Sequence, residues 1–249
     1  MFEGLVADSD LAQADRIPLP LRYQDLSFAF LTFAADEALV APHLPDPRLR
    51  PVQIAPDKVA LAVSIYDYRQ CDLAPYLECG VSVLVETQSE PGISPPPSGF
   101  PALHYVHRLP VTTERSRRIG RAHWGFPKFL GEISFAMGPD TAVGCVIEPD
   151  RYRLDLEAFP GNETLDRRLR LRPLLVPGPI TIAHVVIEGT GMIPLDDATL
   201  QLEFDEGFSD PILSALSEAV FMEGVACQSA SALLSGVIES FPAQTDDRA

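Results

Sequence analysis

Lys128 stands in the stretch GRAHWGFPKFLGEI, between a proline and a phenylalanine. A lysine adds to a carbonyl only as the free amine, and apolar surroundings favour that form because they disfavour the ammonium ion. The chain has two lysines, Lys58 and Lys128, against seventeen arginines, and arginine cannot serve as such an amine because its guanidinium stays protonated. Lys128 is therefore a candidate nucleophile for imine formation. The alternative is a lysine at a strand end that extends over apolar neighbours to water.

The spacing within this stretch resembles the signature of the acetoacetate decarboxylase superfamily. In that family a Gly-Arg-Glu sequence is followed, at a fixed spacing, by an aromatic-Pro-Lys sequence whose lysine forms a Schiff base. Gly120 and Arg121 match the first part of the signature, and Phe126, Pro127 and Lys128 match the second. The resemblance implies that Lys128 is the catalytic lysine.

Two further stretches resemble the same family and occur in the same order. FAFLTFAADEALVAPHLP (28–45) is similar to its N-terminal strand and short helix, and APYLECGVSVLVE (74–86) is similar to its Tyr-x-Glu-x-Gly strand. Tyr76, Glu78 and Gly80 match the second pattern. The resemblance implies that Glu78 is an active-site glutamate, which we expect to move protons. Tyr76 is a candidate donor of a hydrogen bond to the substrate. The alternative for Glu78 is a solvated carboxylate on a strand.

The chain departs from the family pattern at four places. Phe129 stands where the family's decarboxylases carry a second lysine, and Ala122 replaces the glutamate of Gly-Arg-Glu. The first strand reads FLTF (30–33) where the family has an arginine, and ALAVSIY (60–66) offers no carboxylate where the family has a glutamate. Much of the family's polar shell is therefore missing, which argues against acetoacetate itself as the substrate and leaves the activation of Lys128 to desolvation.

Three further side chains of the motif are candidates for substrate binding. Arg121 can hold a carboxylate through two parallel hydrogen bonds. It can equally belong to an exposed basic turn with three neighbouring arginines, or to a structural ion pair. Trp124 and Phe126 can line a pocket, although aromatic residues beside a motif often pack in the core instead.

Composition and charge argue against several classes of partner. The formal net charge of −16 is unfavourable for binding nucleic acid. No apolar run reaches the roughly 18–20 residues needed to cross a bilayer, and no basic amphipathic segment suggests membrane contact. The acidic N-terminus lacks the basic and apolar regions of a signal peptide, so we expect a cytoplasmic protein. The four cysteines have no CxxC spacing and are expected to be reduced.

Motifs for cofactors and metals are missing from the sequence. GxGxxG and GxxxxGK[ST] do not occur, and neither do HExxH or GxSxG. His104 and His107 fall on opposite faces if residues 103–113 form a strand, which argues against a metal site there. We therefore expect no cofactor and no metal.

Short strands, separated by proline and glycine, are the elements expected to position these residues. Alternation and apolar runs predict strands at 24–35, 58–68, 79–87, 103–113 with a break at Pro110, 129–137, 141–148, 151–158, 180–191 and 198–205. Helical segments are predicted at 36–45 with Asp36 as the cap, at 114–120 and at 210–221, and a proline-rich loop at 91–102.

This order of elements predicts a β-rich α+β fold. The resemblance implies an antiparallel β-barrel or cone of the acetoacetate decarboxylase-like type, with a few peripheral helices. We expect one domain over residues 1–249, with an N-terminal arm (1–20) and a disordered tail (243–249). Exposed strand edges, and the tendency of the family to assemble, predict a homo-oligomer.

The sequence thus predicts a carbon–carbon lyase that forms a Schiff base on Lys128 and decarboxylates a β-keto acid. One alternative is a lysine-dependent aldolase-dehydratase that acts on small keto acids or aldehydes. Another is a member of the family that binds a small ligand without catalysis. Retention of Lys128 and Glu78 favours an enzyme, whereas loss of the polar shell favours a binding protein.

Overall fold

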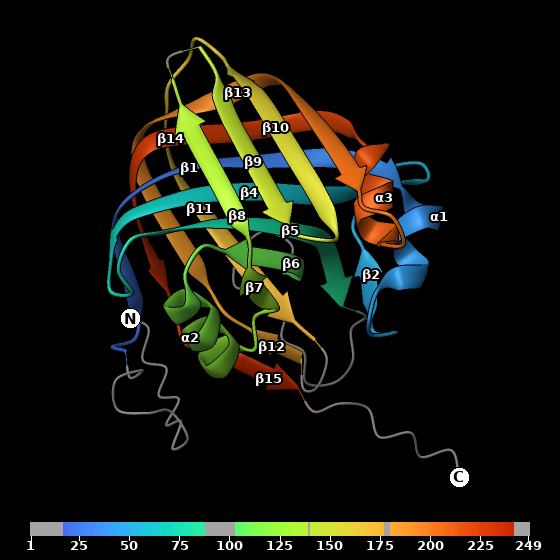
Figure 1. Ribbon diagram of the computed structural model, residues 1–249, viewed down its shortest axis with the longest axis horizontal. Coiled ribbons are helices and arrows are strands. Elements are labelled where there is room, and N and C mark those ends of the chain that lie inside the picture. The colour runs from blue at the N-terminus through green and yellow to red at the C-terminus, as the bar shows by residue number, and fades with distance from the viewer. Residues whose placement is uncertain (1–16, 88–102, 139, 177–179, 242–249) are drawn as a thin grey trace.

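The computed structural model describes residues 17–87, 103–138, 140–176 and 180–241 (Figure 1). The elements are, in chain order, β1 (Leu21–Asp36), α1 (Glu37–Val40), the 3-10 helix η2 (Ala41–His43), β2 (Leu49–Pro51), β3 (Gln53–Ala55), β4 (Lys58–Cys71), β5 (Tyr76–Thr87), β6 (Leu103–Val111), α2 (Glu114–Trp124), β7 (Lys128–Leu130), β8 (Glu132–Met137), β9 (Ala142–Glu148), β10 (Tyr152–Pro160), β11 (Leu165–Leu175), β12 (Ile180–Ile182), β13 (Val185–Phe204), α3 (Pro211–Ser217), β14 (Val220–Leu234) and β15 (Glu239–Phe241). The prediction of a strand-rich fold with a few peripheral helices is confirmed. Among these described residues, no helix is long and apolar enough to cross a lipid bilayer.

Seven of the described strands form a closed ring. The order β11–β6–β5–β4–β1–β14–β13 is hydrogen-bonded throughout, and β11 also pairs with β13, which joins the two ends. The pair between β6 and β11 is parallel, and the other pairs of the ring are antiparallel. An odd number of strands cannot close with antiparallel pairs alone, so one parallel pair is a geometric necessity.

A second layer covers one side of the ring. The long strand β13 belongs to both layers, and β10, β9 and β8 follow it and cross in front of β1, β4 and β5 (Figure 1). An apolar cluster fills the space between the layers, with Val63 from β4, Leu154 from β10 and Leu213 from α3 among its members. A separate apolar cluster fills the inside of the ring, and α2 closes one end of it.

Strands β1 and β4 are buried on both faces, because each lies between the two clusters. The sequence predicts Leu26, Phe28 and Phe30 on one face of β1, and all three contribute to the inside of the ring. In β4, Tyr66 and Tyr68 also face inward, whereas Val63 and its odd-numbered neighbours face the second layer. Because side chains alternate between the two faces of a strand, one set of residues in β1 and β4 faces the inside of the ring, and the other set packs against the second layer.

Helix α2 differs from its prediction at the C-terminal end. We predicted a turn that ends near Gly120, but the helix continues to Trp124. It ends at Gly125, which has φ 76°, a left-handed conformation that glycine adopts without steric cost. Gly120 lies inside the helix, where it allows a close approach by a side chain described below.

The strand predicted at 129–137 is divided in two. Gly131 separates β7 from β8, and its N–H donates to the carbonyl of Val111 at 3.1 Å. A Cβ at Gly131 would lie 3.1 Å from Cβ of Pro110, so the close approach of β6 requires glycine there. The break predicted at Pro110 is wrong, because β6 continues to Val111. The pairing of β6 with β5 instead has a register shift, of the kind a β-bulge makes, between the Val81–Arg108 and Ser82–Val106 pairs.

The C-terminal third contains the larger corrections. The strands predicted at 180–191 and 198–205 are a short β12 followed by the single long strand β13. The helix predicted at 210–221 ends at Ser217. Strands β11 and β14 were not predicted, although both belong to the ring. Asp36 precedes α1 without capping it by its side chain, which pairs with Lys58 instead.

Some predicted segments fall on residues that the structure does not describe. The loop at 91–102 and the tail at 243–249 lie outside the described residues, as does the N-terminal arm up to residue 16.

Candidate active site

Lys128 points into the closed end of the ring. It is the first residue of β7, which pairs in parallel with β6 so that Lys128 lies opposite Leu109. The lysine is only 4% exposed, so the alternative of a side chain extending to water is wrong. Phe129, the next residue, faces the other side of β7, where the guanidinium of Arg108 lies 5.9 Å from its ring centre. A second lysine at position 129 would therefore point away from Lys128.

Helix α2 and the turn after it fix the start of β7. Thr113 caps the helix with its side chain, and Gly125 ends it. The N–H of Phe126 donates to the carbonyl of Gly120 at 3.2 Å, and the N–H of Lys128 donates to the carbonyl of Phe126 at 2.7 Å. The two hydrogen bonds fold the chain back over the helix, so that the Lys128 side chain lies against Gly120.

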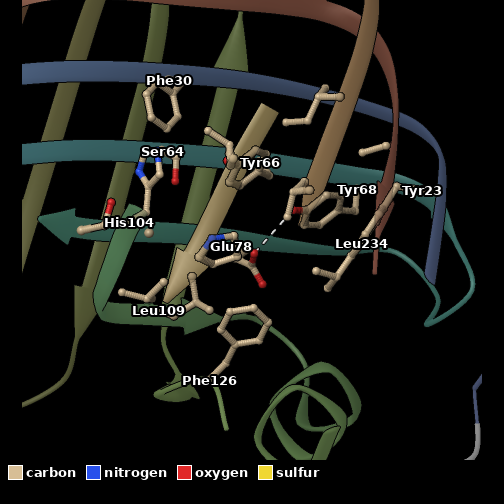
Figure 2. Close-up of a pocket in the computed structure, with 18 of the residues that line it drawn as sticks. Tyr23, Phe30, Ser64, Tyr66, Tyr68, Glu78, His104, Leu109, Phe126 and Leu234 are labelled. Atoms are coloured by element: carbon tan, nitrogen blue, oxygen red, sulfur yellow. Dashed lines mark hydrogen bonds between the residues drawn. The ribbon is translucent and has the colours of Figure 1, made fainter. Parts of the chain in front are cut away.

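Glu78 is the charged partner of Lys128. It lies on β5, opposite Tyr66 of β4 and Val111 of β6, and is 8% exposed. Its Oε2 atom is 2.6 Å from Nζ of Lys128. The hydroxyl of Tyr68 donates to the other carboxylate oxygen at 3.4 Å (Figure 2). The alternative of a solvated strand carboxylate is therefore wrong for Glu78.

Aromatic side chains surround this ion pair. Nζ of Lys128 lies 5.4 Å from the ring centre of Tyr76 and 5.6 Å from that of Phe126. The hydroxyl groups of Tyr76 and Tyr23 are 3.3 Å apart, and the ring of Tyr23 lies 4.3 Å from that of Tyr68. The amine therefore meets aromatic rings and one carboxylate in a largely buried position.

The tyrosines of the site remain protonated phenols. Burial raises the pKa of Tyr23, Tyr68 and Tyr76 well above its ordinary value, and the nearby carboxylate of Glu78 raises it further. Burial also raises the pKa of Tyr66, in spite of a hydrogen bond with Ser64 that acts in the opposite direction. All four can donate a proton in a hydrogen bond near neutral pH.

A cavity of about 90 Å³ opens in front of the ion pair. A buried water molecule needs about 10–15 Å³ on this scale, so the cavity has room for roughly six to nine non-hydrogen atoms. Every strand of the ring contributes to its wall, and Figure 2 shows the side chains converging from β1, β4, β5 and β6. Glu78 and Phe126 lie at one end, and His104 and Ser64 lie beyond Leu109.

The predicted site residues do not all reach this cavity. Lys128, Glu78 and Phe126 line it, and Tyr76 contacts the lysine from behind. Arg121 is exposed and donates from Nη1 to the carbonyl oxygen of Lys128 at 3.3 Å, so it holds the backbone of β7. Trp124 is buried beside the site, and its Nε1 donates to the carbonyl of Ser235 at 2.7 Å.

Several residues of the wall were not predicted. Tyr23, Tyr66, Tyr68 and His104 all line the cavity, and each lies inside or next to a predicted strand. Two of the segments that depart from the family pattern contribute to the wall. Phe30 comes from FLTF (30–33), and Ser64 and Tyr66 come from ALAVSIY (60–66). The described residues contain no group of three or more His, Cys, Asp or Glu that could hold a metal ion.

Comparison with known proteins identifies the family. Residues 11–182 match the family model described as acetoacetate decarboxylase (ADC). The chain belongs to the acetoacetate decarboxylase family. A comparison with curated protein sequences gave no significant match.

Solved structures of the acetoacetate decarboxylase type share the fold. The chain is similar to acetoacetate decarboxylase from Legionella pneumophila, with a TM-score of 0.63 and 15% identity over 95% of this chain and 99% of that one. It is similar to the enduracididine biosynthesis enzyme MppR complexed with pyruvate, with a TM-score of 0.62 and 13% identity over 96% and 97%. An acetoacetate decarboxylase-like enzyme from Sphingomonas wittichii gives a TM-score of 0.58 and 14% identity over 96% and 99%.

Proposed function

We propose that this protein is a Schiff-base lyase in which Lys128 forms an iminium ion with a small carbonyl substrate. The observation that carries the proposal is the 2.6 Å contact between Nζ of Lys128 and Oε2 of Glu78 at the end of a cavity lined by apolar and aromatic side chains. At this distance a proton can pass from the amine to the carboxylate and back. The aromatic walls keep water from the amine while the substrate is bound.

Glu78 relays the two protons that iminium formation moves from nitrogen to oxygen. As a base it takes one proton from the Lys128 ammonium, which frees the amine, and a second from the nitrogen after the amine has added to the carbonyl carbon. As an acid it delivers each proton in turn to the former carbonyl oxygen, which leaves as water and produces the iminium ion. Tyr68, which donates to Glu78 Oε1 at 3.4 Å, positions the carboxylate. The reaction needs no oxidant, reductant or cofactor.

A β-keto acid is the proposed substrate class. Its carboxylate loses CO2, and the electron pair of the broken carbon–carbon bond moves into the iminium ion to give an enamine. Protonation of the enamine carbon and hydrolysis of the imine then release a ketone and the free lysine. The balance is one β-keto carboxylate anion and one proton consumed for one ketone and one CO2 released, since the water lost in imine formation is regained in its hydrolysis. Membership of the acetoacetate decarboxylase family supports this reaction.

Aldol addition with loss of water is the second candidate. It uses the same enamine, which attacks an aldehyde instead of taking up a proton. The similarity to MppR favours it, because one MppR structure contains the condensation product of pyruvate and imidazole 4-carboxaldehyde.

Reductive trapping tests the shared step. The protein is incubated with acetone and borohydride, and the adduct is located by mass spectrometry of peptides. We expect a reduced adduct on Lys128 that disappears in Lys128→Arg. The matched control is Lys58→Arg, because Lys58 is the chain's other lysine and forms an exposed pair with Asp36. A wild-type protein without an adduct, or an adduct that persists in Lys128→Arg, contradicts the proposal.

Product analysis separates the two candidate reactions. Release of CO2 from β-keto acids supports the lyase. Condensation of pyruvate with an aldehyde, without CO2 release from any β-keto acid, supports the aldolase-dehydratase. A protein that traps acetone on Lys128 but catalyses neither reaction is a ligand-binding member of the family.

A further inference from the structure

The cavity continues past the lysine into a region with a different chemical character. Along β5 its wall is formed by Glu78, Gly80 and Ser82 in turn. His104 of β6 pairs with Leu84, two residues after Ser82 on β5. Gly80 keeps the passage open. A Cβ there would lie 2.8 Å from Oγ of Ser64 and 3.4 Å from Cδ1 of Leu109, within the space between the ion pair and His104.

The remote end contains polar groups but no charge. His104 is 6% exposed, and its ring meets Phe30 edge-on at 5.7 Å (Figure 2). Burial lowers the pKa of His104 to about 4, so the imidazole is neutral near pH 7. Among the residues that line the cavity, Lys128 and Glu78 are the only ion pair, and no arginine contributes to the wall. A carboxylate placed at this end would be buried without a counter-charge.

A neutral imidazole carries one hydrogen-bond donor and one acceptor. Among the described residues, His104 contacts the ring of Phe30, and none hydrogen-bonds to its ring nitrogens. Ser64 adds a hydroxyl to the same side of the cavity. Because an unpaired buried polar group is costly, the imidazole gains most from a ligand that supplies a hydrogen bond of its own, whereas the Ser64 hydroxyl already has Tyr66 as a partner.

We propose that His104, Ser64 and Phe30 form a specificity subsite that binds a neutral, hydrogen-bonding group of the substrate, remote from the carbonyl that reacts with Lys128. The inference rests on the proposed function, and it narrows the substrate to a carbonyl compound whose distal end is an ester, amide, hydroxyl or carbonyl group. A distal carboxylate is disfavoured because no cation faces it. A purely apolar tail is disfavoured because it leaves the imidazole unpaired.

Three methyl ketones test the subsite by borohydride trapping on the full-length protein. Methyl levulinate carries a neutral distal ester, and levulinate carries a carboxylate at the same place. Methyl hexyl ketone has the same number of non-hydrogen atoms as methyl levulinate but an apolar tail. We expect half-maximal trapping of methyl levulinate at a concentration about tenfold lower than for either of the other two, which corresponds to about 1.4 kcal/mol, the scale of one hydrogen bond.

Variants of His104 separate recognition from folding. His104→Phe keeps a planar ring and removes both hydrogen-bonding atoms, so it is expected to abolish the preference for methyl levulinate over methyl hexyl ketone. His104→Gln keeps a neutral donor and acceptor and is expected to retain part of it. Acetone has no distal group, so the ratio of methyl levulinate trapping to acetone trapping within each variant separates a loss of recognition from a general loss of activity.

The outcomes distinguish the subsite from the Schiff base. Equal trapping of the three ketones by the wild-type protein, or an equal loss of acetone and methyl levulinate trapping in His104→Phe, overturns the subsite. If acetone is not trapped at all, the proposed function fails, and calorimetric binding of the same ketones decides the subsite. Tighter binding of methyl levulinate than of methyl hexyl ketone, lost in His104→Phe, then supports it, and equal binding overturns it.

Discussion

The backbone of Gly120 packs directly against the side chain of Lys128. A Cβ added to Gly120 would lie 2.5 Å from Cδ, 2.7 Å from Cε and 3.2 Å from Nζ of the lysine. These separations are shorter than van der Waals contact, so any other residue at position 120 forces the lysine to move. The glycine of the sequence motif is thus explained by the space that the lysine occupies, eight residues later in the chain.

Replacing Gly120 by alanine is expected to lower the rate of imine formation strongly and to change the free energy of unfolding little. The added methyl group displaces the Lys128 side chain from Glu78, and a small misplacement of a reacting group can cost about 100-fold in rate. Alanine also favours the helix by up to about 1 kcal/mol relative to glycine, which offsets part of the steric cost. The rate of acetone trapping and the free energy of unfolding, measured by urea titration, are the two readouts.

Gly125→Ala is the matched control for that variant. Gly125 has φ 76° and no atom within 4 Å of an added Cβ, so alanine there strains the backbone without meeting a neighbour. We expect it to lower the free energy of unfolding by about 1 kcal/mol while the trapping rate stays within about twofold of wild type. A Gly120→Ala protein that traps acetone at the wild-type rate contradicts the proposed role of the glycine.

Glu78→Gln is expected to slow imine formation by about 100-fold or more, because general acid–base catalysis contributes on the order of 10²–10⁴ in rate. The amide keeps the shape of the side chain but cannot accept a proton from Lys128. Trapping rates with acetone measure the effect. Glu86→Gln, the same substitution at an exposed position of β5, is the control and is expected to leave the rate unchanged. Equal rates for Glu78→Gln and wild type would remove Glu78 from the mechanism.

The two charged residues of the site could be predicted because a local motif carries each of them. Lys128 and Gly120 interact across a helix end and a turn, within one short stretch of sequence. Glu78 lies in a strand whose pattern also resembles the family. The aromatic residues around them could not be predicted in the same way. Strand β4 is apolar on both faces, so alternation does not indicate that Tyr66 and Tyr68 face the site.

The closure of the ring depends on contacts that sequence periodicity does not report. Strand β14 pairs with β1 across about 200 residues of chain, with Phe28 opposite Cys227. Its segment VFMEGVACQSASALL is rich in small residues and has no clear alternation, and the residues before it have the spacing of a helix. Tertiary pairing therefore overrides local preference in β14, which is the reason that its prediction failed.

Acidification is expected to destabilise the protein in the pH window below 6.5. Burial lowers the pKa of His104 to about 4, whereas the unfolded chain titrates near 6.5. Between these values the unfolded state binds more protons, so the free energy of unfolding falls as the pH falls. The full effect of this one residue is about 3 kcal/mol, reached below about pH 4.

His104→Gln tests that expectation, because glutamine stays neutral over the whole range. Urea unfolding at about pH 7 and about pH 4.5 gives the loss of stability for each protein. We expect a smaller loss for the variant than for wild type. The variant still loses some stability on acidification because of His184, whose pKa is also lowered to about 4, by burial and then by the charge of Arg172. An identical loss in both proteins would show that His104 titrates normally.

Asp210 joins β6 to α3 on the face of the ring opposite the cavity. It accepts hydrogen bonds from His107 at 2.8 Å and from Arg108 at 2.8 Å, and it caps α3 through the N–H groups of Ile212 and Leu213. Burial alone would raise its pKa, but the hydrogen bond and charge of His107, with Arg108 and the Leu213 N–H, hold the pKa well below its usual range.

Asp210→Ala is expected to lower the free energy of unfolding by about 1–3 kcal/mol, because it removes the cap of α3 and one of the two carboxylate partners of the partly buried Arg108, which keeps Glu148. Asp210→Asn retains the helix cap and is expected to cost less. Acetone trapping by the folded protein should remain at the wild-type level in both, since neither His107 nor Arg108 lines the cavity. Asp155→Ala, which removes the exposed pair with Arg153, is the control and is expected to change stability little. If Asp210→Ala is as stable as Asp155→Ala, the junction between β6 and α3 depends on apolar packing alone.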